Sequence, residues 1–134
     1  MNQKTLLDEL VKILKLIIAH PRAIVELISL VAESGCEAQI LKVLLVRIQT
    51  LIQLGVLATK AKEFEPIGDG LYSMHVTGRG FNLRILYSFL PDRSPALLLS
   101  FYEREGKRRT DYTTQKEPAK SRLKELLEEN KNGQ

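Results

Sequence analysis

The sequence predicts an α+β fold, in which N-terminal helices pack on one face of a small antiparallel sheet and a C-terminal helix follows the sheet. Apolar residues recur at helical spacing through most of the first half of the chain. Residues 71–112 then contain two segments that alternate apolar and polar residues and one that is continuously apolar, as is typical of strands. A length of 134 residues is typical of one domain, so we expect a single α+β domain over residues 1–134.

Three helices are predicted before the sheet. Their apolar residues recur every three or four positions over Leu6–Ala19, Arg22–Ser34 and Glu37–Leu54. Pro21 is expected to end the first helix, and Gly35 and Gly55 the other two, because proline does not continue a helix and glycine is common just after one. The first helix, within residues 1–21, is expected to be an addition to the rest of the domain.

The stretch Ala61–Gly70 is predicted to be a connection, because a proline and two glycines interrupt it. Three strands are expected after it, over Leu71–Val76, Leu83–Phe89 and Ala96–Tyr102. The last strand is apolar at nearly every position, which is the pattern of a central strand covered on both faces. The sequence thus predicts a sheet of three strands.

The first two of these strands also predict how they pair. If Val76 lies opposite Leu83, then His75 lies opposite Arg84, and both of these polar side chains are on one face. The side chains on the other face are then all apolar: Tyr72, Met74, Val76, Leu83, Ile85 and Tyr87. We expect the apolar face to pack on helices and the face of His75 and Arg84 to be open.

A basic segment, Glu103–Tyr112, follows the last strand and leads to the last helix. Pro118 fits the first turn of that helix, which is expected to run to about Glu129. Its predicted buried stripe consists of Ala119, Leu123, Leu126 and Leu127.

The charge distribution indicates a class of partner. The net charge is +4, and residues 1–74 contain eight basic and eight acidic residues, so the whole excess lies in residues 75–134. Such an asymmetry favours a nucleic-acid or acidic-protein partner, although a solvated basic face without a ligand fits it equally well. One cysteine, no signal-peptide pattern and apolar runs too short to span a membrane together predict a cytoplasmic protein.

Several kinds of chemistry find no support in the motifs. Only two histidines are present and no Cys/His cluster exists, so no metal site and no cofactor are predicted. Phosphate-binding loops and the Gly-x-Ser-x-Gly hydrolase motif are also missing. What remains is a group of cations near one edge of the sheet, with a tyrosine nearby: His75, Arg79, Arg84, Lys107, Arg108, Arg109 and Tyr112.

These residue types suit RNA cleavage. That reaction needs a group that takes the proton of a 2′-hydroxyl, a cation that offsets charge on the phosphate, and a donor for the leaving oxygen. A guanidinium group binds phosphate through two parallel hydrogen bonds, and histidine can transfer protons. Basic neighbours would lower the pKa of Tyr112, so that it could transfer protons as well. Plain phosphate binding fits nearly as well, and a salt-bridged Arg84 or a half-exposed His75 without a role remain alternatives.

A family resemblance rests on four segments in this order: Gly70-Leu71-Tyr72, Arg84–Phe89, Leu97–Phe101, and Lys116 with Pro118-Ala119. Together they resemble the RelE/HigB superfamily of toxins, most closely its phage-derived RelE-like branch, over about residues 23–127. The resemblance implies a small antiparallel sheet with helices on one face and an active groove on the other. It also implies mRNA cleavage, commonly on the ribosome, by a toxin that a cognate antitoxin silences.

Carried over residue by residue, the resemblance assigns four catalytic positions: Arg84, which would hold the scissile phosphate, His75 on the neighbouring strand, and Arg108 and Tyr112 in the tail. The cations expected to bind RNA phosphates are Arg79, Lys107, Arg109 and Lys116. The chain departs from the family pattern where Ser73 replaces a lysine of some relatives, and where an N-terminal helix replaces a short first strand. Such departures bear on catalytic potency more than on fold.

The first hypothesis is a metal-independent endoribonuclease, the toxin of a type II toxin–antitoxin system, which inhibits translation in the cytoplasm. Its expected partners are the antitoxin and mRNA, on the ribosome, with no membrane; the oligomeric state is left open. Two alternatives belong to other classes. One is a ParE-like toxin that poisons DNA gyrase, and the other is a non-catalytic interaction module whose basic tail binds nucleic acid.

Overall fold

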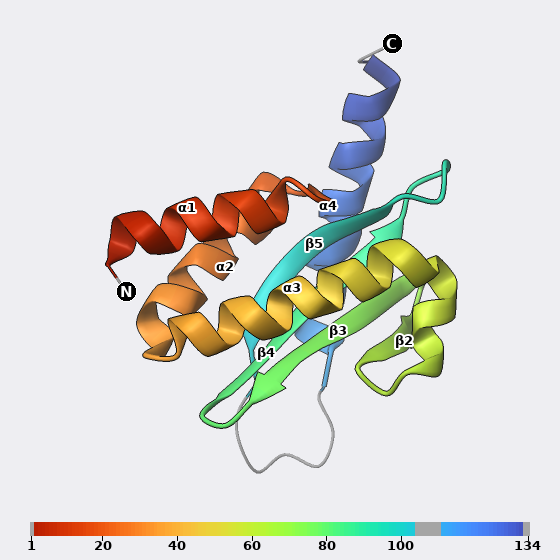
Figure 1. Ribbon diagram of the computed structural model, residues 1–134. Helices are drawn as coiled ribbons and strands as arrows, with labels where there is room; N and C mark the ends of the chain where they lie inside the picture. The colour runs from red at the N-terminus through yellow and green to blue at the C-terminus, as the bar shows by residue number, and fades with distance from the viewer. Residues whose placement is uncertain (1, 104–110, 133–134) are drawn as a thin grey trace.

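The computed structural model describes residues 2–103 and 111–132. In chain order its elements are α1 (Gln3–Leu14), β1 (Ile18–Ala19), α2 (Pro21–Ser34), α3 (Glu37–Leu54), the 3-10 helix η1 (Gly55–Lys60), β2 (Phe64–Gly68), β3 (Leu71–Gly78), β4 (Phe81–Phe89), β5 (Pro95–Tyr102) and α4 (Thr113–Asn132). The fold is α+β, with helices before the sheet and a helix after it, as the sequence predicts (Figure 1).

The strands form one sheet in the order β1-β5-β4-β3-β2. The two-residue strand β1 runs parallel to β5, and the other neighbouring strands are antiparallel. The predicted pairing of β3 with β4 is confirmed: His75 lies opposite Arg84 and Val76 lies opposite Leu83. The alternation fixes this register because a slip of one residue would turn every apolar side chain of the strand toward the wrong face.

Helices α2 and α3 pack on the apolar face of the sheet, α3 crosses that face in Figure 1, and α1 packs against α2 and α3. The buried side chains between them include Leu27, Leu44, Ile48, Met74, Ile85 and Tyr87. The opposite face was expected to be open, but it is covered along part of its length. The start of α4 covers part of it and buries Leu86 and Leu99 against Ala119 (Figure 1). The rest of that face, with His75 and Arg84, is half-buried.

An ion pair attaches α4 to α2 at the edge of β5. Arg122 of α4 donates from its terminal nitrogens to both carboxylate oxygens of Glu26 of α2, at 2.8 and 2.9 Å. The same two residues bind the backbone of β5, because Arg122 donates to the carbonyl of Leu98 and the amide of Ser100 donates to Glu26, both at 3.0 Å. Beyond the short strand β1, side chains therefore satisfy two backbone groups of this edge, the carbonyl of Leu98 and the amide of Ser100.

The first helix ends earlier than predicted. It ends at Leu14 instead of Ala19, and Ile18–Ala19 forms strand β1 beside Ala96 and Leu97. Two consecutive β-branched residues at 17 and 18 suit an extended backbone, and pairing with β5 outweighs their helical spacing. The chain thus has both the additional helix and a short first strand. His20 caps α2 by accepting a hydrogen bond from the amide of Arg22.

The sheet has five strands where three were predicted. The stretch read as a connection contains β2. Strand β5, predicted to be covered on both faces, lies between β1 and β4 and is buried from Ala96 to Ser100. Strand β2 tolerates Pro66 because it lies at the edge, where an amide is not needed for a further neighbour. Its register shifts between Pro66 and Gly68, so its pattern is too irregular to predict a strand.

The last helix begins at Thr113 instead of at Pro118. Asp111 accepts the amide of Thr113 at 3.0 Å and so caps the helix start, and Pro118 lies inside the helix on an exposed position. Because proline has no amide hydrogen, the helical hydrogen bond to the carbonyl of Thr114 is missing. Thr114 is exposed, so water can bind this carbonyl instead. Among the predicted stripe, Ala119 is buried while Leu123, Leu126 and Leu127 are half-buried.

Within the described residues, one helical stretch, Glu37–Lys60, has the length and apolar composition of a membrane span. The sequence alone had indicated that no apolar run was long enough. Its inner face packs on the sheet through buried residues such as Ile40, Leu44 and Ile48.

Candidate active site

Neighbouring positions on β3 and β4 bring the two main predicted residues together. His75 and Arg84 are directly opposite in the antiparallel pair, so their side chains emerge on the same face. The backbone of His75 is held on both sides, because its amide donates to the carbonyl of Glu63 at 2.8 Å and its carbonyl accepts from Nε of Arg47 at 2.9 Å. The sheet and α3 thus fix where this pair of side chains begins.

Strand β2 adds a carboxylate to the pair. Oε1 of Glu65 lies 2.8 Å from Nε2 of His75, and Glu65 is opposite Ser73 in the register of β2 with β3. Since an ionised carboxylate only accepts hydrogen bonds, Nε2 of His75 carries the proton. Nδ1 has no partner among the described residues and keeps its lone pair. Glu65 and His75 therefore form a carboxylate–imidazole pair with the free nitrogen available to accept a proton.

Tyr112, just before α4, supports the same carboxylate. Its hydroxyl donates to Oε1 of Glu65 at 2.5 Å and lies 2.9 Å from the hydroxyl of Ser73. The ring is 9% exposed and packs edge-on against Phe101, with ring centroids 6.1 Å apart. Tyr112 is thus held by its ring and its hydroxyl together, and it fixes one side of Glu65.

The charges of these groups follow from their surroundings. Burial acts to raise the pKa of Glu65, but hydrogen bonds from Tyr112 and His75 and the charge of Arg84 outweigh it, so that pKa lies below its usual range. Burial lowers the pKa of His75, and the nearby cation Arg84 lowers it too, against the opposing effect of Glu65. At neutral pH the site therefore holds an ionised Glu65 and a neutral His75.

The expectation that basic neighbours lower the pKa of Tyr112 is wrong. Burial raises the pKa of Tyr112, and the hydrogen bond to the anionic Glu65 raises it further, while the charge of Arg84 opposes this only weakly. A tyrosine that donates to a carboxylate gives up its proton less readily than a free one. Tyr112 is therefore a neutral donor that positions Glu65.

Arg84 provides the positive charge of the site. One terminal nitrogen donates to the side-chain oxygen of Asn82, two residues earlier on β4, and lies 3.4 Å from the carbonyl of Leu83. Its Nε is buried and has no hydrogen-bond partner among the described residues. No carboxylate pairs with Arg84 in the part of the chain described, so its charge acts on the site without being neutralised by a salt bridge.

The other predicted residues lie farther out or outside the described residues. Arg79 is exposed at the tip of the β3–β4 hairpin, beyond the pair Thr77–Asn82. Lys116 is half-buried in the first turns of α4 and lines a pocket that Glu65 and Tyr112 also line. Lys107, Arg108 and Arg109 fall outside the described residues, so three predicted cations have no position here.

Glu65, Ser73 and Asn82 belong to the site but were not predicted from the sequence. Glu65 was overlooked because its strand was read as a connection. Ser73 carried a signal, since its predicted position opposite Leu86 puts it on the face of His75, and the structure buries it there completely. A buried serine hydroxyl on that face needs a polar partner, and Tyr112 provides it.

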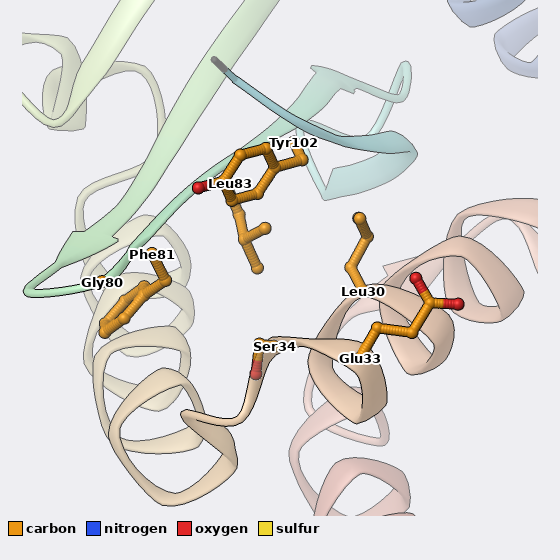
Figure 2. A pocket seen from close by; sticks show the side chains of 7 residues that line it. All are labelled: Leu30, Glu33, Ser34, Gly80, Phe81, Leu83 and Tyr102. Atoms are coloured by element: carbon orange, nitrogen blue, oxygen red, sulfur yellow. The ribbon is translucent and has the colours of Figure 1, made fainter. Parts of the chain in front are cut away.

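Two hollows lie on opposite faces of the sheet, one beside α4 and the other beside α2. One, of about 320 Å³, adjoins the site between β2 and the start of α4 and has Glu65, Tyr112 and Lys116 in its wall. The other, of about 290 Å³, is shown in Figure 2, where Leu30, Phe81 and Leu83 surround it and the carboxylate of Glu33 points away from it. The polar wall of the first hollow makes it the one related to the site.

Among the described residues, no group of three or more histidine, cysteine, aspartate or glutamate side chains could hold a metal ion. Comparisons with protein-family models, with curated proteins and with solved structures find no match to this chain.

Proposed function

We propose that this chain is a metal-independent endoribonuclease that cleaves mRNA and inhibits translation, as the toxin of a type II toxin–antitoxin system. The observation that supports it best is the arrangement of Glu65, His75 and Arg84. A neutral imidazole is oriented by a carboxylate at 2.8 Å, and a guanidinium that forms no salt bridge with the described carboxylates starts from the position directly opposite on the next strand. The resemblance of the sequence to the RelE/HigB superfamily supports the same reading.

In the first step, Nδ1 of His75 takes the proton of an RNA 2′-hydroxyl, and the 2′-oxygen attacks the adjacent phosphorus. Glu65 keeps the imidazole in the required tautomer and stabilises the imidazolium that forms, as the carboxylate does in other carboxylate–histidine pairs. The guanidinium of Arg84 binds the non-bridging oxygens and offsets the negative charge that grows on them.

In the second step, the bond from phosphorus to the 5′-oxygen breaks. Water protonates this leaving oxygen, and the resulting hydroxide takes the proton held by His75. The products are a 2′,3′-cyclic phosphate and a 5′-hydroxyl. Tyr112 and Ser73 act as positioning residues, because the tyrosine hydroxyl is already bonded to Glu65 and to Ser73 inside the protein.

The substrate, the compartment and the partner protein follow from the proposed function. mRNA on the ribosome is the substrate, the cytoplasm is the compartment, and a cognate antitoxin neutralises the toxin. The excess of basic residues in the second half of the chain favours binding to a polyanion.

The test compares purified wild-type protein with the variants His75→Gln and Arg84→Ala on a labelled RNA, with and without ribosomes. Each variant should lower the cleavage rate by about 100-fold or more, because each removes a group that acts in the transition state. The new ends should carry 2′,3′-cyclic phosphate. Lys42→Ala, which removes an exposed cation on α3, is the matched control and should cleave at the wild-type rate.

Expression of the same variants in a bacterial host separates the alternative functions. Wild type should arrest growth, whereas His75→Gln and Arg84→Ala should not, at equal soluble yield. Growth arrest with intact RNA and induced DNA damage would instead indicate gyrase poisoning. Neither arrest nor cleavage by the wild type would contradict a toxin and leave a binding module.

A further inference from the structure

Three residues on neighbouring strands form a row across the face of the sheet that carries the site. His75 of β3 lies opposite Arg84 of β4, and Arg84 lies opposite Phe101 of β5. Residues directly opposite each other in antiparallel strands present their side chains on the same face. His75, Arg84 and Phe101 therefore follow one another across the strands, with the arginine in the middle.

The backbone hydrogen bonds define the spacing of this row. The amide of Glu103 donates to the carbonyl of Asn82, and the amide of His75 donates to the carbonyl of Glu63, on the side of β2, both at 2.8 Å. Because the two kinds of pair alternate along an antiparallel ladder, Arg84 forms a hydrogen-bonded pair with its neighbour on β5 and a non-hydrogen-bonded pair with His75. The Cα atoms of such pairs are about 5.5 and about 4.5 Å apart. Arg84 is thus flanked on both sides at the spacing of adjacent strands.

Helix α4 covers Phe101 less completely than the residue before it on the same face. Leu99, two residues earlier on β5, is 6% exposed and belongs to the cluster that contains Ala119 of α4, whereas Phe101 is half-buried. The ring of Phe101 meets that of Tyr112 edge to face, with centroids 6.1 Å apart and planes at 83°. Such a contact uses at most one face of each ring. A half-buried ring with a face that Tyr112 does not cover therefore stands next to Arg84 in the row.

The order of the row gives a bound RNA a direction. In the proposed reaction, His75 takes the proton of the 2′-hydroxyl that precedes the scissile phosphate, and Arg84 binds that phosphate. The attacking 2′-oxygen and the leaving 5′-oxygen lie in line on opposite sides of the phosphorus. With the 2′-oxygen toward His75, the 5′-oxygen and the nucleotide attached to it lie on the side of Phe101.

An aromatic ring at this position suits a nucleobase, because proteins bind the unstacked bases of single-stranded RNA on aromatic side chains. We propose that Phe101 stacks on the base of the nucleotide that follows the cleaved phosphate. Every base has a π-face, so this subsite recognises the presence of a base and tolerates any of the four. The inference rests on the proposed function for the direction of the RNA, but the stacking itself can be measured without cleavage.

The experiment uses dinucleotides that bind without being cleaved. In dApA the first sugar lacks the 2′-hydroxyl, and the single phosphate leaves one position for each base. Two further probes have an abasic sugar in place of either the first or the second nucleoside. NMR titration of isotope-labelled full-length protein gives the dissociation constant of each probe. Wild type should bind dApA about fivefold more tightly than the probe without the second base, and the ring protons of Phe101 should shift only with probes that contain that base.

Three variants sharpen the test. Phe101→Leu keeps an apolar side chain but removes the ring, so it should weaken binding of dApA about fivefold and leave binding of the probe without the second base unchanged. Phe101→Tyr keeps the ring and should bind dApA like wild type. Tyr102→Leu is the matched control, because Tyr102 is the next residue of β5, is 46% exposed and lines the hollow on the opposite face (Figure 2). It should bind all three probes like wild type.

Each variant is compared on two probes, so a partial loss of folded protein lowers both signals equally and does not imitate the expected result. The stacking role is overturned if wild type binds dApA no more tightly than the probe without the second base. It is also overturned if Phe101→Leu weakens both probes equally, or if its effect depends on the first base.

The outcomes separate this inference from the proposed function. A loss in Phe101→Leu that requires the second base supports the stacking role even if the protein cleaves no RNA, in which case the nuclease proposal fails by itself. Cleavage of RNA by a protein whose Phe101→Leu variant shows no such loss overturns the stacking role and leaves the nuclease proposal standing.

Discussion

The hydroxyl of Tyr112 donates to the carboxylate of Glu65 over 2.5 Å, and this bond joins the start of α4 to the edge strand β2. The same oxygen of Glu65 accepts from His75. One acceptor atom thus connects three elements of the fold, and any change at Tyr112 should reach His75 through Glu65.

Tyr112→Phe tests this connection. The ring should still pack on Phe101, but Glu65 loses a donor and the buried hydroxyl of Ser73 loses its partner. We expect the pKa of Glu65 to rise and the protein to lose about 1 kcal/mol of unfolding free energy. NMR titration of the Glu65 side-chain carbon and chemical denaturation measure the two effects. A Glu65 pKa that stays the same would contradict the positioning role of Tyr112.

The dependence of folding stability on pH follows from the lowered pKa of His75, and its sign can be derived. The pKa of folded His75 lies below the ordinary 6.5, so the folded protein keeps this imidazole neutral at pH values where the unfolded chain is already protonated. Stability should therefore decrease as the pH falls below about 6.5. The low pKa of Glu65 acts in the same direction, since its contribution is lost as that carboxylate is protonated. His75→Gln should flatten the upper part of this stability profile.

The rate of RNA cleavage should depend on pH in a related way. Because neutral His75 is the proposed base, the rate should rise with pH through a pKa below 6.5 and level off near neutrality. The profile of kcat/KM on a short RNA measures it. An apparent pKa above 7 would show that another group takes the proton.

Arg84→Lys distinguishes charge from shape at the phosphate. Lysine keeps the positive charge but cannot hold two phosphate oxygens in the planar manner of a guanidinium, and it lacks the nitrogen that bonds to Asn82 in this geometry. We expect cleavage between that of wild type and Arg84→Ala, with the larger loss in kcat. Single-turnover rates at saturating RNA measure this, and full activity of Arg84→Lys would mean that only the field of the cation matters.

Arg122→Met tests the ion pair at the edge of β5. The variant leaves the carboxylate of Glu26 and the carbonyl of Leu98 without their donor. We expect a loss of about 2 kcal/mol of unfolding free energy, at the low end for a buried pair because the Glu26 side chain is 32% exposed. The double variant with Glu26→Leu should lose less than the sum of the single variants. Strict additivity in urea denaturation would show that the two residues do not act together.

The sequence predicted the part of the site that depends on alternation and missed the part at the irregular edge. His75 and Arg84 were placed opposite each other because the apolar residues around them allow one register only. Glu65 was missed because Pro66 and Gly68 mark a connection in most sequences, and only pairing with β3 makes this stretch a strand. Local patterns do not contain that long-range contact.

The start of α4 shows a second limit. Pro118 indicated a helix start, but the cap at Asp111 begins the helix earlier. The additional turns carry Lys116 to the wall of the hollow beside Glu65. Buried Arg122 was also unpredictable, since a charged residue is buried only where partners on other elements meet it, here Glu26 and the carbonyl of Leu98.

The ion pair that closes the edge of β5 has a consequence for synthesis on the ribosome. Glu26 is made early, but Arg122 is added after all strands of the sheet. A nascent chain that has completed β5 and not yet released α4 therefore exposes a strand edge open to pairing with another chain. Premature termination within α4 should accordingly yield aggregates instead of a shortened soluble protein.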